Sequence, residues 1–505
     1  MDQVTSAIEG MLDALGGSTA VMSAGGQTVT ATGWRRHPGW GTDPTKPELV
    51  AEFDYSLTED AVRPRYRLDL SAKTYLVPTD LHYTETGDGS RGFVDGVDFM
   101  FNPQHVHTAL PSWRVGARLR HLHITSPLRL ARALVAPGAD VTVPANDPTV
   151  LVLREAGSPP VRIRLDPATS LPTTLEVTEE HSPHGDAAVE VAFTDYRPTG
   201  DLVLPHHVTI SIDGRQVHDE TRTDITVIAQ IDDTPFALPE NTADVRDGTV
   251  EQLGYASYSN QWIMNYVLAG VPFYFDLQIA PVLPQPLDLG PGVKLVVGPS
   301  HNTLVVEMSD HVVTVEAPLY NAYARAALRQ VTAAFPGKPL RKTIATHFHY
   351  DHIGGIREFA ANGDLTVLVG SPSVPFFEEV LHSEHTVAPD RMAANPVPVN
   401  VEGIDDKLVL PTADGGTLEV HRITSDHSGD MSIVYLSKPK IVFESDLWNP
   451  TPTMPERGAQ RGRLASQLYD AIVALGLDVE TIVGGHGSGP VHSAPLAYLR
   501  TAADR

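Results

Sequence analysis

The sequence predicts a two-domain protein, with an α/β domain in its C-terminal half and a β-rich (α+β) domain before it. The chain has 505 residues, more than one core usually accommodates, and its 42% share of hydrophobic residues is sufficient for two cores. Residues 1–245 consist mainly of short strand-like stretches separated by turns. Residues 287–505 instead contain a histidine-rich motif that lies between a strand-like and a helix-like stretch.

The N-terminal domain, residues 1–245, begins with a predicted helix over Thr5–Leu15, which Gly16-Gly17 ends. Turn signals such as Asp88-Gly89 and Asp213-Gly214 separate the stretches that follow, which predicts a mostly antiparallel sheet. These stretches are VTATGWR, RYRLDLS, TVLVLRE, VRIRLD, TTLEVTEE, AAVEVAFTDYR and HHVTISIDG. The rhythm of the last three resembles that of the curved-sheet domains of outer-membrane lipoprotein carriers.

Two histidine pairs in this half, His105 with His107 and His121 with His123, would each share one face of a strand if extended. No third ligand lies at a workable spacing from either pair. We therefore interpret them as solvated or hydrogen-bonded strand residues rather than metal ligands.

Residues 246–286 form an unusually aromatic connector between the two halves. Aromatic side chains dominate cores and interfaces by buried area, so we expect them to pack the domains together. A second interpretation, that they line a substrate pocket, stays open because pockets often lie at domain interfaces.

The segment from His347 to His352 places three imidazoles and a carboxylate within six positions. If the segment is extended, His347 and His349 share a face and can reach one ion, whereas Asp351 and His352, at a helix entrance, can reach a second. Imidazole and carboxylate ligands suit zinc, and iron or manganese are also possible. Two ligands leave each ion short, so further ligands must come from downstream.

Three candidates follow strand-like stretches farther along the chain. His427 comes after Leu418–Ile423, Asp446 ends a predicted hairpin, and His486 follows a short strand among glycines that allow a close backbone approach. We expect His427 to complete the first ion's ligands and His486 the second's. Asp446 would bridge the two ions.

This series of residues resembles the metallo-β-lactamase superfamily, whose signature HxHxDH is followed by His, Asp and His in that order. The resemblance covers residues 287–505 and includes Gly354-Gly355 after the motif and Asn302 in the opening hairpin. It implies an αββα sandwich and a dinuclear site, with two zinc ions as the expected cofactors. Glu316 departs from the family, in which Asp is common at that position, and we expect it to support the ligands rather than bind metal.

The resemblance also implies hydrolysis by a metal-bound hydroxide, with Asp351 as a catalytic residue that orients the hydroxide or carries its proton. The expected substrate is a small-molecule ester, lactone, thioester or amide. Diiron relatives replace one histidine with Glu, and the histidines at 349 and 427 argue against that chemistry. A diiron oxygenase, or a ligand carrier with a vestigial metal domain, remains an alternative. Four residues near the motifs are candidate substrate contacts: Tyr350, Ser428, Trp448 and Asn449.

The formal net charge of -25 argues against a nucleic-acid partner, because phosphate backbones require clustered Lys and Arg. The absence of cysteine excludes disulfides and thiol catalysis. No apolar run reaches the length of a membrane span, and the first residues lack the features of a signal peptide. We therefore expect a cytoplasmic protein that acts on a small molecule. Export, with a leader absent from this sequence, is the alternative, and the oligomeric state is open.

Overall fold

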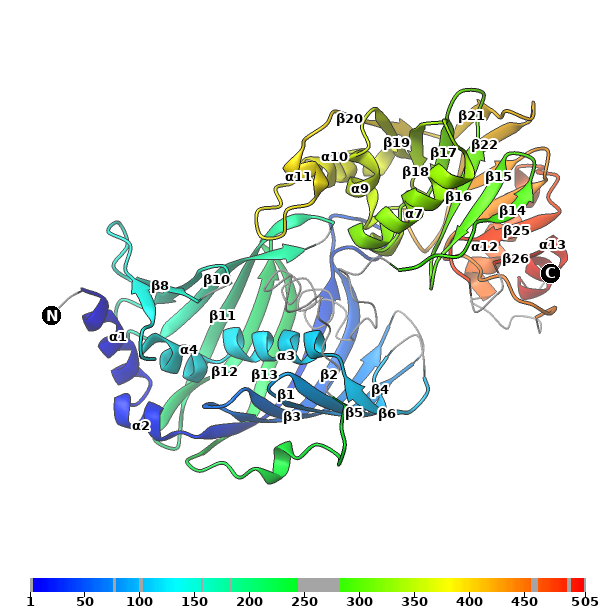
Figure 1. Ribbon diagram of the computed structural model, residues 1–505. Helices are drawn as coiled ribbons and strands as arrows, with labels where there is room; N and C mark the ends of the chain where they lie inside the picture. The colour runs from blue at the N-terminus through cyan, green and yellow to red at the C-terminus, as the bar shows by residue number, and fades with distance from the viewer. Residues whose placement is uncertain are drawn as a thin grey trace. The chain divides into compact units, whose positions relative to one another are not determined.

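The structure is a computed structural model that describes residues 3–75, 79–99, 103–155, 158–181, 183–243, 281–455, 462–487 and 492–503. Its contacts divide the chain into two compact units (Figure 1). Within the described residues, the first unit comprises 3–38, 47–181 and 186–243. The second comprises 39–46, 183–185 and the residues from 281 onward. Most of the predicted connector, residues 246–286, lies outside the described residues.

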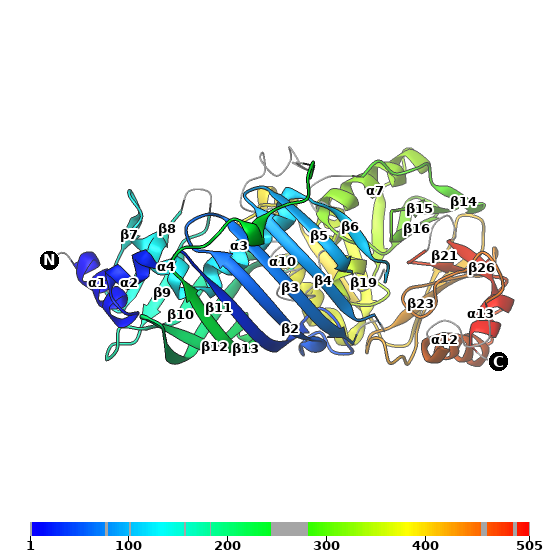
Figure 2. The same cartoon turned by 90° about the horizontal axis from the view of Figure 1, so that it is seen from below.

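The first unit is built on one 13-stranded sheet, in the order β6-β5-β4-β3-β2-β1-β13-β12-β11-β10-β9-β8-β7 (Figure 2). The sheet is antiparallel, as predicted, and β1 lies beside β13 with Gly26 opposite Ile228. The strands are β1 (Gly26–His37), β2 (Glu48–Asp60), β3 (Arg65–Thr74), β4 (Leu81–Asp88), β5 (Arg91–Val97), β6 (Val106–Leu110), β7 (Asp140–Thr142), β8 (Val150–Arg154), β9 (Val161–Leu165), β10 (Pro172–His181), β11 (Gly185–Thr199), β12 (Leu202–Ile212) and β13 (Arg215–Ile228).

The strands form because apolar residues alternate along them. In β3, for example, Tyr66, Leu68 and Leu70 are buried, whereas Asp69 and Lys73 between and beyond them are exposed. The helices of the unit are α1 (Gln3–Ala14), α2 (Ser18–Ser23), α3 (Ser112–Thr125) and α4 (Pro127–Leu134), with a 3₁₀ turn η1 (Thr234–Phe236). The first of these matches the helix predicted over Thr5–Leu15.

Helix α3 corrects one sequence interpretation, because His121 and His123 lie on a helix and not on a strand. Its residues Val115 and Leu122 pack in the same core as strands β2 to β5. The helix also buries Arg114 and Arg118, which pair with Glu85 of β4 at 2.7 and 3.1 Å. These buried charged residues interrupt the apolar stripe by which a helix is usually recognised in a sequence.

The second unit has two mixed sheets, of seven and six strands. The first, in the order β14-β15-β16-β17-β18-β19-β20, contains β14 (Leu287–Gly290), β15 (Val293–Val297), β16 (Asn302–Glu307), β17 (Val312–Val315), β18 (Leu340–Ile344), β19 (Leu365–Gly370) and β20 (Val399–Ile404). The second, in sequence order, contains β21 (Lys407–Pro411), β22 (Thr417–Arg422), β23 (Ser432–Leu436), β24 (Ile441–Glu444), β25 (Thr481–Gly484) and β26 (Ser493–Pro495).

The two sheets face each other across a shared apolar core, to which Val306 and Val315 contribute from one side and Val434 and Phe443 from the other. Helices cover the outer faces, which gives the αββα sandwich expected from the sequence (Figure 1). They are α7 (Asn321–Ala334), α8 (Tyr350–Ile353), α9 (Ile356–Ala360), α10 (Val374–His382), α11 (Arg391–Ala394), α12 (Gly462–Ala474) and α13 (Leu496–Ala502), with a 3₁₀ turn η3 (Ser371–Ser373). None of the described helices has the length and apolar character needed to cross a bilayer.

Candidate metal centre

All seven predicted ligands lie at one edge of the second unit, in segments that follow the ends of strands. His347 and His349 follow β18, and α8 then presents Asp351 and His352. The other three follow β22, β24 and β25: they are His427, Asp446 and His486. Because β17 runs parallel to β18, and β24 parallel to β25, these strands deliver their following loops to the same edge of each sheet.

The first cluster consists of His347, His349 and His427. Their ring centroids are 4.5 to 5.0 Å apart, and each offers a ligand atom within 4.8 Å of the others and of Asp446. His347 is fully buried and His349 is 3% exposed. This is the grouping expected for one ion.

The second cluster consists of Asp351, His352 and His486. Asp351 Oδ2 lies 3.5 Å from His352 Nε2 and 3.7 Å from His486 Nε2, and the two imidazole nitrogens are 3.2 Å apart. These separations are close to the distance of about 3.4 Å between ligand atoms around a tetrahedral ion. This is the grouping expected for the other ion.

Asp446 lies between the two clusters. Its Oδ2 is 2.9 Å from His427 Nε2 and 3.1 Å from His352 Nε2, and its Oδ1 is 2.7 Å from His486 Nε2. One carboxylate therefore reaches nitrogens of both clusters. The backbone at Asp446 has a φ of 67°, a left-handed conformation that is uncommon for residues other than glycine and is often found at functional sites.

The residues fit a cation. His347 Nε2 and His427 Nε2 lie 3.5 and 2.9 Å from Asp446 Oδ2 without forming a hydrogen bond, and Asp351 Oδ1 is a buried atom without a hydrogen-bond partner. A metal ion would satisfy all three atoms. Burial, and next the neighbouring His352, lowers the pKa of His347 to about 3, and burial also lowers the pKa of His349 well below its usual range. Both imidazoles are therefore neutral at pH 7, the form that binds metals.

His352 differs from His347 and His349, because its surroundings favour the positively charged imidazolium. Burial lowers its pKa, but the carboxylates of Glu316, Asp446 and Asp351 outweigh burial and raise the pKa of His352 well above its usual value. Imidazoles likewise hold the pKa of Asp351 and of Asp446 low despite their burial. A bound ion would replace the proton on His352 as the counter-charge of these carboxylates.

Glu316, which follows β17, hydrogen-bonds to His352 and also lies close enough to His347 and His352 to form a possible ligand group with them. Its Oε2 accepts a hydrogen bond from His352 Nδ1 at 3.0 Å, and its Oε1 accepts from Thr346 Oγ1 at 2.6 Å and Ser445 Oγ at 2.5 Å. Because the Thr346 hydroxyl donates to Glu316, its oxygen is available to accept from His347 Nδ1 at 3.0 Å. Glu316 thereby orients two imidazoles with Nε2 toward the clusters.

His349 is oriented by a segment far away in the sequence. Its Nε2 donates to the backbone oxygen of Gly41 at 2.8 Å, which leaves Nδ1 as the nitrogen available for a metal. The same segment, residues 39–46, accepts a hydrogen bond from the Gly429 amide at Thr42 and places Trp40 5.7 Å from the ring of Tyr350. Nothing in the sequence near residue 41 indicates this contact.

The glycines near the motifs are required by close packing. A Cβ atom at Gly354 would collide with the backbone of Leu319, and one at Gly485 would collide with the Ser445 hydroxyl.

The four candidate substrate contacts have different surroundings. Tyr350 is 8% exposed and lies against Trp40, and Asn449 is partly exposed. Ser428 is fully buried with its hydroxyl on Asp430 Oδ1 at 2.5 Å, and Trp448 is 2% exposed within an apolar cluster. The burial of Ser428 and Trp448 leaves neither side chain exposed to a substrate.

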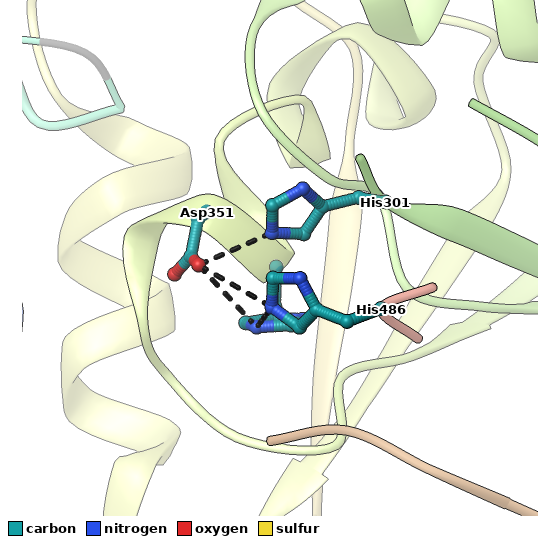
Figure 3. A group of neighbouring side chains, drawn as sticks. His301, Asp351 and His486 are labelled. Carbon is teal, nitrogen blue, oxygen red and sulfur yellow. Dashed lines mark hydrogen bonds and ion pairs between the residues drawn. The ribbon is translucent and has the colours of Figure 1, made fainter. Parts of the chain in front are cut away.

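One further residue was missed by the sequence analysis. His301, just before β16, offers a ligand atom within 4.8 Å of those of the second cluster, and its Nε2 is 3.1 Å from Asp351 Oδ2 (Figure 3). No spacing signal marks it, because it lies far from the HxHxDH motif in the sequence.

Comparison with known proteins agrees with this fold. Residues 296–486 match the family model of the metallo-beta-lactamase superfamily, so this part of the second unit has the metallo-β-lactamase fold. No curated protein matches the chain.

Solved structures with a similar fold include a B3 metallo-β-lactamase with an active-site glutamic acid, at 18% identity and a TM-score of 0.32, which covers 45% of this chain and 88% of that one. A metallo-β-lactamase from Pontibacter korlensis has 16% identity and a TM-score of 0.33, and covers 44% and 97%. The sec-alkyl sulfatase PisA1 has 16% identity and a TM-score of 0.31, and covers 43% and 41%.

Proposed function

We propose that this protein is a dinuclear metal-dependent hydrolase, with zinc as the metal, that cleaves a small-molecule ester, lactone, thioester or amide. The observation that carries the proposal is the convergence of seven ligand side chains on one edge of the second unit, with three of their buried polar atoms left without hydrogen bonds. His347, His349 and His427 would hold one ion, and Asp351, His352 and His486 the other. Asp446 would be shared.

Two bound ions would lower the pKa of a shared water toward neutrality and polarise the scissile carbonyl group. The chain itself would position these ligands and transfer the proton of the attacking water. Asp351 has one oxygen, Oδ2, beside the imidazoles of the second cluster, whereas its Oδ1 is without a hydrogen bond. This second oxygen can accept a proton from the attacking water and return it to the leaving group.

The absence of a Glu at position 349 or 427 supports hydrolysis over oxygen chemistry. The cluster is complete, which favours an enzyme over a carrier with a vestigial metal domain. The formal charge of -25 supports a small-molecule rather than a nucleic-acid substrate.

The test combines metal analysis with substrate screening. Purified protein supplied with Zn²⁺, Fe²⁺ or Mn²⁺ and then desalted should retain about two ions per chain. It should also hydrolyse members of a panel of chromogenic esters, lactones, β-lactams and phosphodiesters. His347→Ala should lose metal and all turnover, whereas His421→Ala, which removes a buried histidine of β22 that pairs with Glu419, should keep both. Retention of well below one ion per chain by the unaltered protein would refute the dinuclear site.

A further inference from the structure

His301 has the surroundings of a metal ligand. It is 5% exposed, and its ring centroid lies 3.9 Å from that of His486 and 5.1 Å from that of His352. Its Nε2 is 3.1 Å from Asp351 Oδ2, slightly less than the 3.2 to 3.7 Å between the ligand atoms of the second cluster. Figure 3 shows the imidazoles of His301 and His486 on the same side of the Asp351 carboxylate.

The hydrogen bonds of His301 follow the pattern of the predicted ligands. Its Nδ1 lies 2.8 Å from Ser300 Oγ, just as Nδ1 of His352 faces Glu316 and Nδ1 of His347 faces Thr346. For His352 and His347 the partner oxygen accepts the Nδ1 proton, so Nε2 is the nitrogen that would bind a metal. The Ser300 hydroxyl can accept from or donate to His301 Nδ1, so this contact is compatible with the tautomer of His301 in which Nε2 binds a metal.

The backbone fixes His301 beside His486. The two residues form an isolated antiparallel bridge, and the next residue, Asn302, donates from its backbone amide to Gly485 O at 2.8 Å and from its side chain to Gly484 O at 2.9 Å. The Tyr323 hydroxyl also donates to His301 O at 2.6 Å. These contacts thus fix a histidine that none of the predicted motifs includes, and rigid support of this kind is typical of residues that bind a metal directly.

From this geometry we propose that His301 is an additional ligand of the ion held by the second cluster. The inference rests on the proposed function, since it assigns an additional residue to the same dinuclear site. The second ion would then have five protein groups, from His301, Asp351, His352, His486 and the shared Asp446.

The two ions would consequently differ in role. The first ion has four protein groups, three imidazoles and Asp446, and keeps more room for water and substrate. The second ion would be held by more protein groups, so we expect it to bind more tightly than the first. Its ligands would include Asp351 and the shared Asp446, which it would hold in place beside the first ion.

The test is proton NMR of the Co²⁺-loaded full-length protein in H₂O and in D₂O, in which each coordinated imidazole with a ring N–H gives one strongly shifted, solvent-exchangeable resonance. The wild type should show six such resonances, one for each histidine of the two clusters and one for His301. Five would overturn the proposal, and this count requires no variant.

Two substitutions separate ligation from a hydrogen bond to Asp351. His301→Gln retains an N–H donor near the position of Nε2 but is a poor metal ligand, and His301→Ala removes both. If His301 is a ligand, both variants should lose one resonance and bind the tighter Co²⁺ ion at least about tenfold more weakly in chelator competition, since even indirect supports of metal ligands are worth that much. Imidazole added to His301→Ala should restore the resonance.

His421→Ala is the matched control and should leave all six resonances and both affinities unchanged. Wild-type affinity and spectrum in His301→Gln would overturn the inference and assign His301 to hydrogen bonding alone. Two bound ions and hydrolysis with only five resonances would refute the inference and leave the proposed function intact, whereas no Co²⁺ binding would refute both.

Discussion

At the scale of single residues, Asp446 carries more of the site than any other ligand because it faces both clusters. Asp446→Asn removes one negative charge next to His352, His427 and His486. We expect the bound metal to fall from about two ions per chain to below one after desalting, and turnover to be lost. Metal content per chain measures this directly.

Two nearby aspartates are controls for this prediction. Asp426 forms one exposed ion pair with Arg463 and a hydrogen bond with Gln467, and buried Asp430 accepts from the Ser428 hydroxyl. Neither belongs to a metal-ligating group among the described residues. If Asp430→Asn lost as much metal as Asp446→Asn, the third and fourth ligand positions would be assigned wrongly.

Glu316 acts on the metal through other residues. Glu316→Gln keeps the size of the side chain but removes the charge that holds His352 Nδ1–H, so we expect metal affinity to fall about 10- to 100-fold with little change in the ligands themselves. Chelator competition gives the affinity. Glu358→Gln is the control, since Glu358 is equally buried but pairs with Arg325 and Arg391 away from the clusters. Equal losses of affinity in the two variants would show that Glu316 has only a folding role.

At the scale of secondary structure elements, the sequence was sufficient to predict the elements whose buried residues follow a regular pattern within a single segment. The hairpin that ends at Asp446 is present as β23 and β24, because its alternating residues face two different cores: Ile433 the helices and Val434 the opposite sheet. Helix α3 was missed because Arg114 and Arg118 are buried against Glu85, a pairing that only the folded sheet creates. His301 was missed for the same kind of reason, since its proximity to His486 depends on a backbone bridge between distant segments.

The packing of α3 on β13 makes the stability of the first unit dependent on pH. Burial, and next the nearby His218 and Arg118, lowers the pKa of His121 on α3. Burial also lowers the pKa of His218 on β13. Arg35, Arg118 and Glu220 also face this pair. Below the unfolded pKa of about 6.5, the unfolded chain binds protons that the folded unit does not, so stability falls as pH decreases from 7 to 5.

Each histidine can contribute a slope of up to about 1.4 kcal/mol per pH unit in this range. Denaturant unfolding at several pH values should therefore show a shallower pH dependence for His121→Gln than for the wild type. Carboxylates such as Glu85, whose pKa is lowered despite burial because Arg114 and Arg118 are close, affect stability only below about pH 4.5. An unchanged slope between pH 7 and 5 in the variant would contradict the assignment to His121.

The segment 39–46 is a second element whose effect the sequence does not reveal. Trp40 is 6% exposed and packs near Tyr350, and the adjacent Gly41 carbonyl orients His349. Trp40→Ala should loosen this segment and weaken metal binding by about tenfold, as expected for loss of an indirect support. Metal titration is the measurement. Trp34→Ala, which removes another tryptophan, in β1, should leave the metal affinity unchanged. Equal losses of metal affinity in Trp34→Ala and Trp40→Ala would exclude a specific role for the segment.

At the scale of the whole molecule, the metal-binding unit is not continuous in the sequence. The order of the candidate ligands was sufficient to predict the superfamily, whose model matches residues 296–486, because the signature residues follow local strands. It did not indicate that residues 39–46 belong to the same compact unit. Such membership depends on a hydrogen bond and ring contacts between residues about 300 positions apart, which no local pattern encodes.

A fragment from Leu287 to Arg505 would therefore contain all seven predicted ligands but lack the Gly41 carbonyl and Trp40. We expect it to bind the first ion more weakly than the full chain, because His349 loses the partner of its Nε2, and to expose apolar surface at Tyr350. Metal titration and binding of an apolar dye measure the two effects. Its affinity should resemble that of full-length Trp40→Ala, which tests the same contact without truncation. A soluble fragment with full metal affinity and full activity on every substrate would show that residues 39–46 do not contribute to the metal centre.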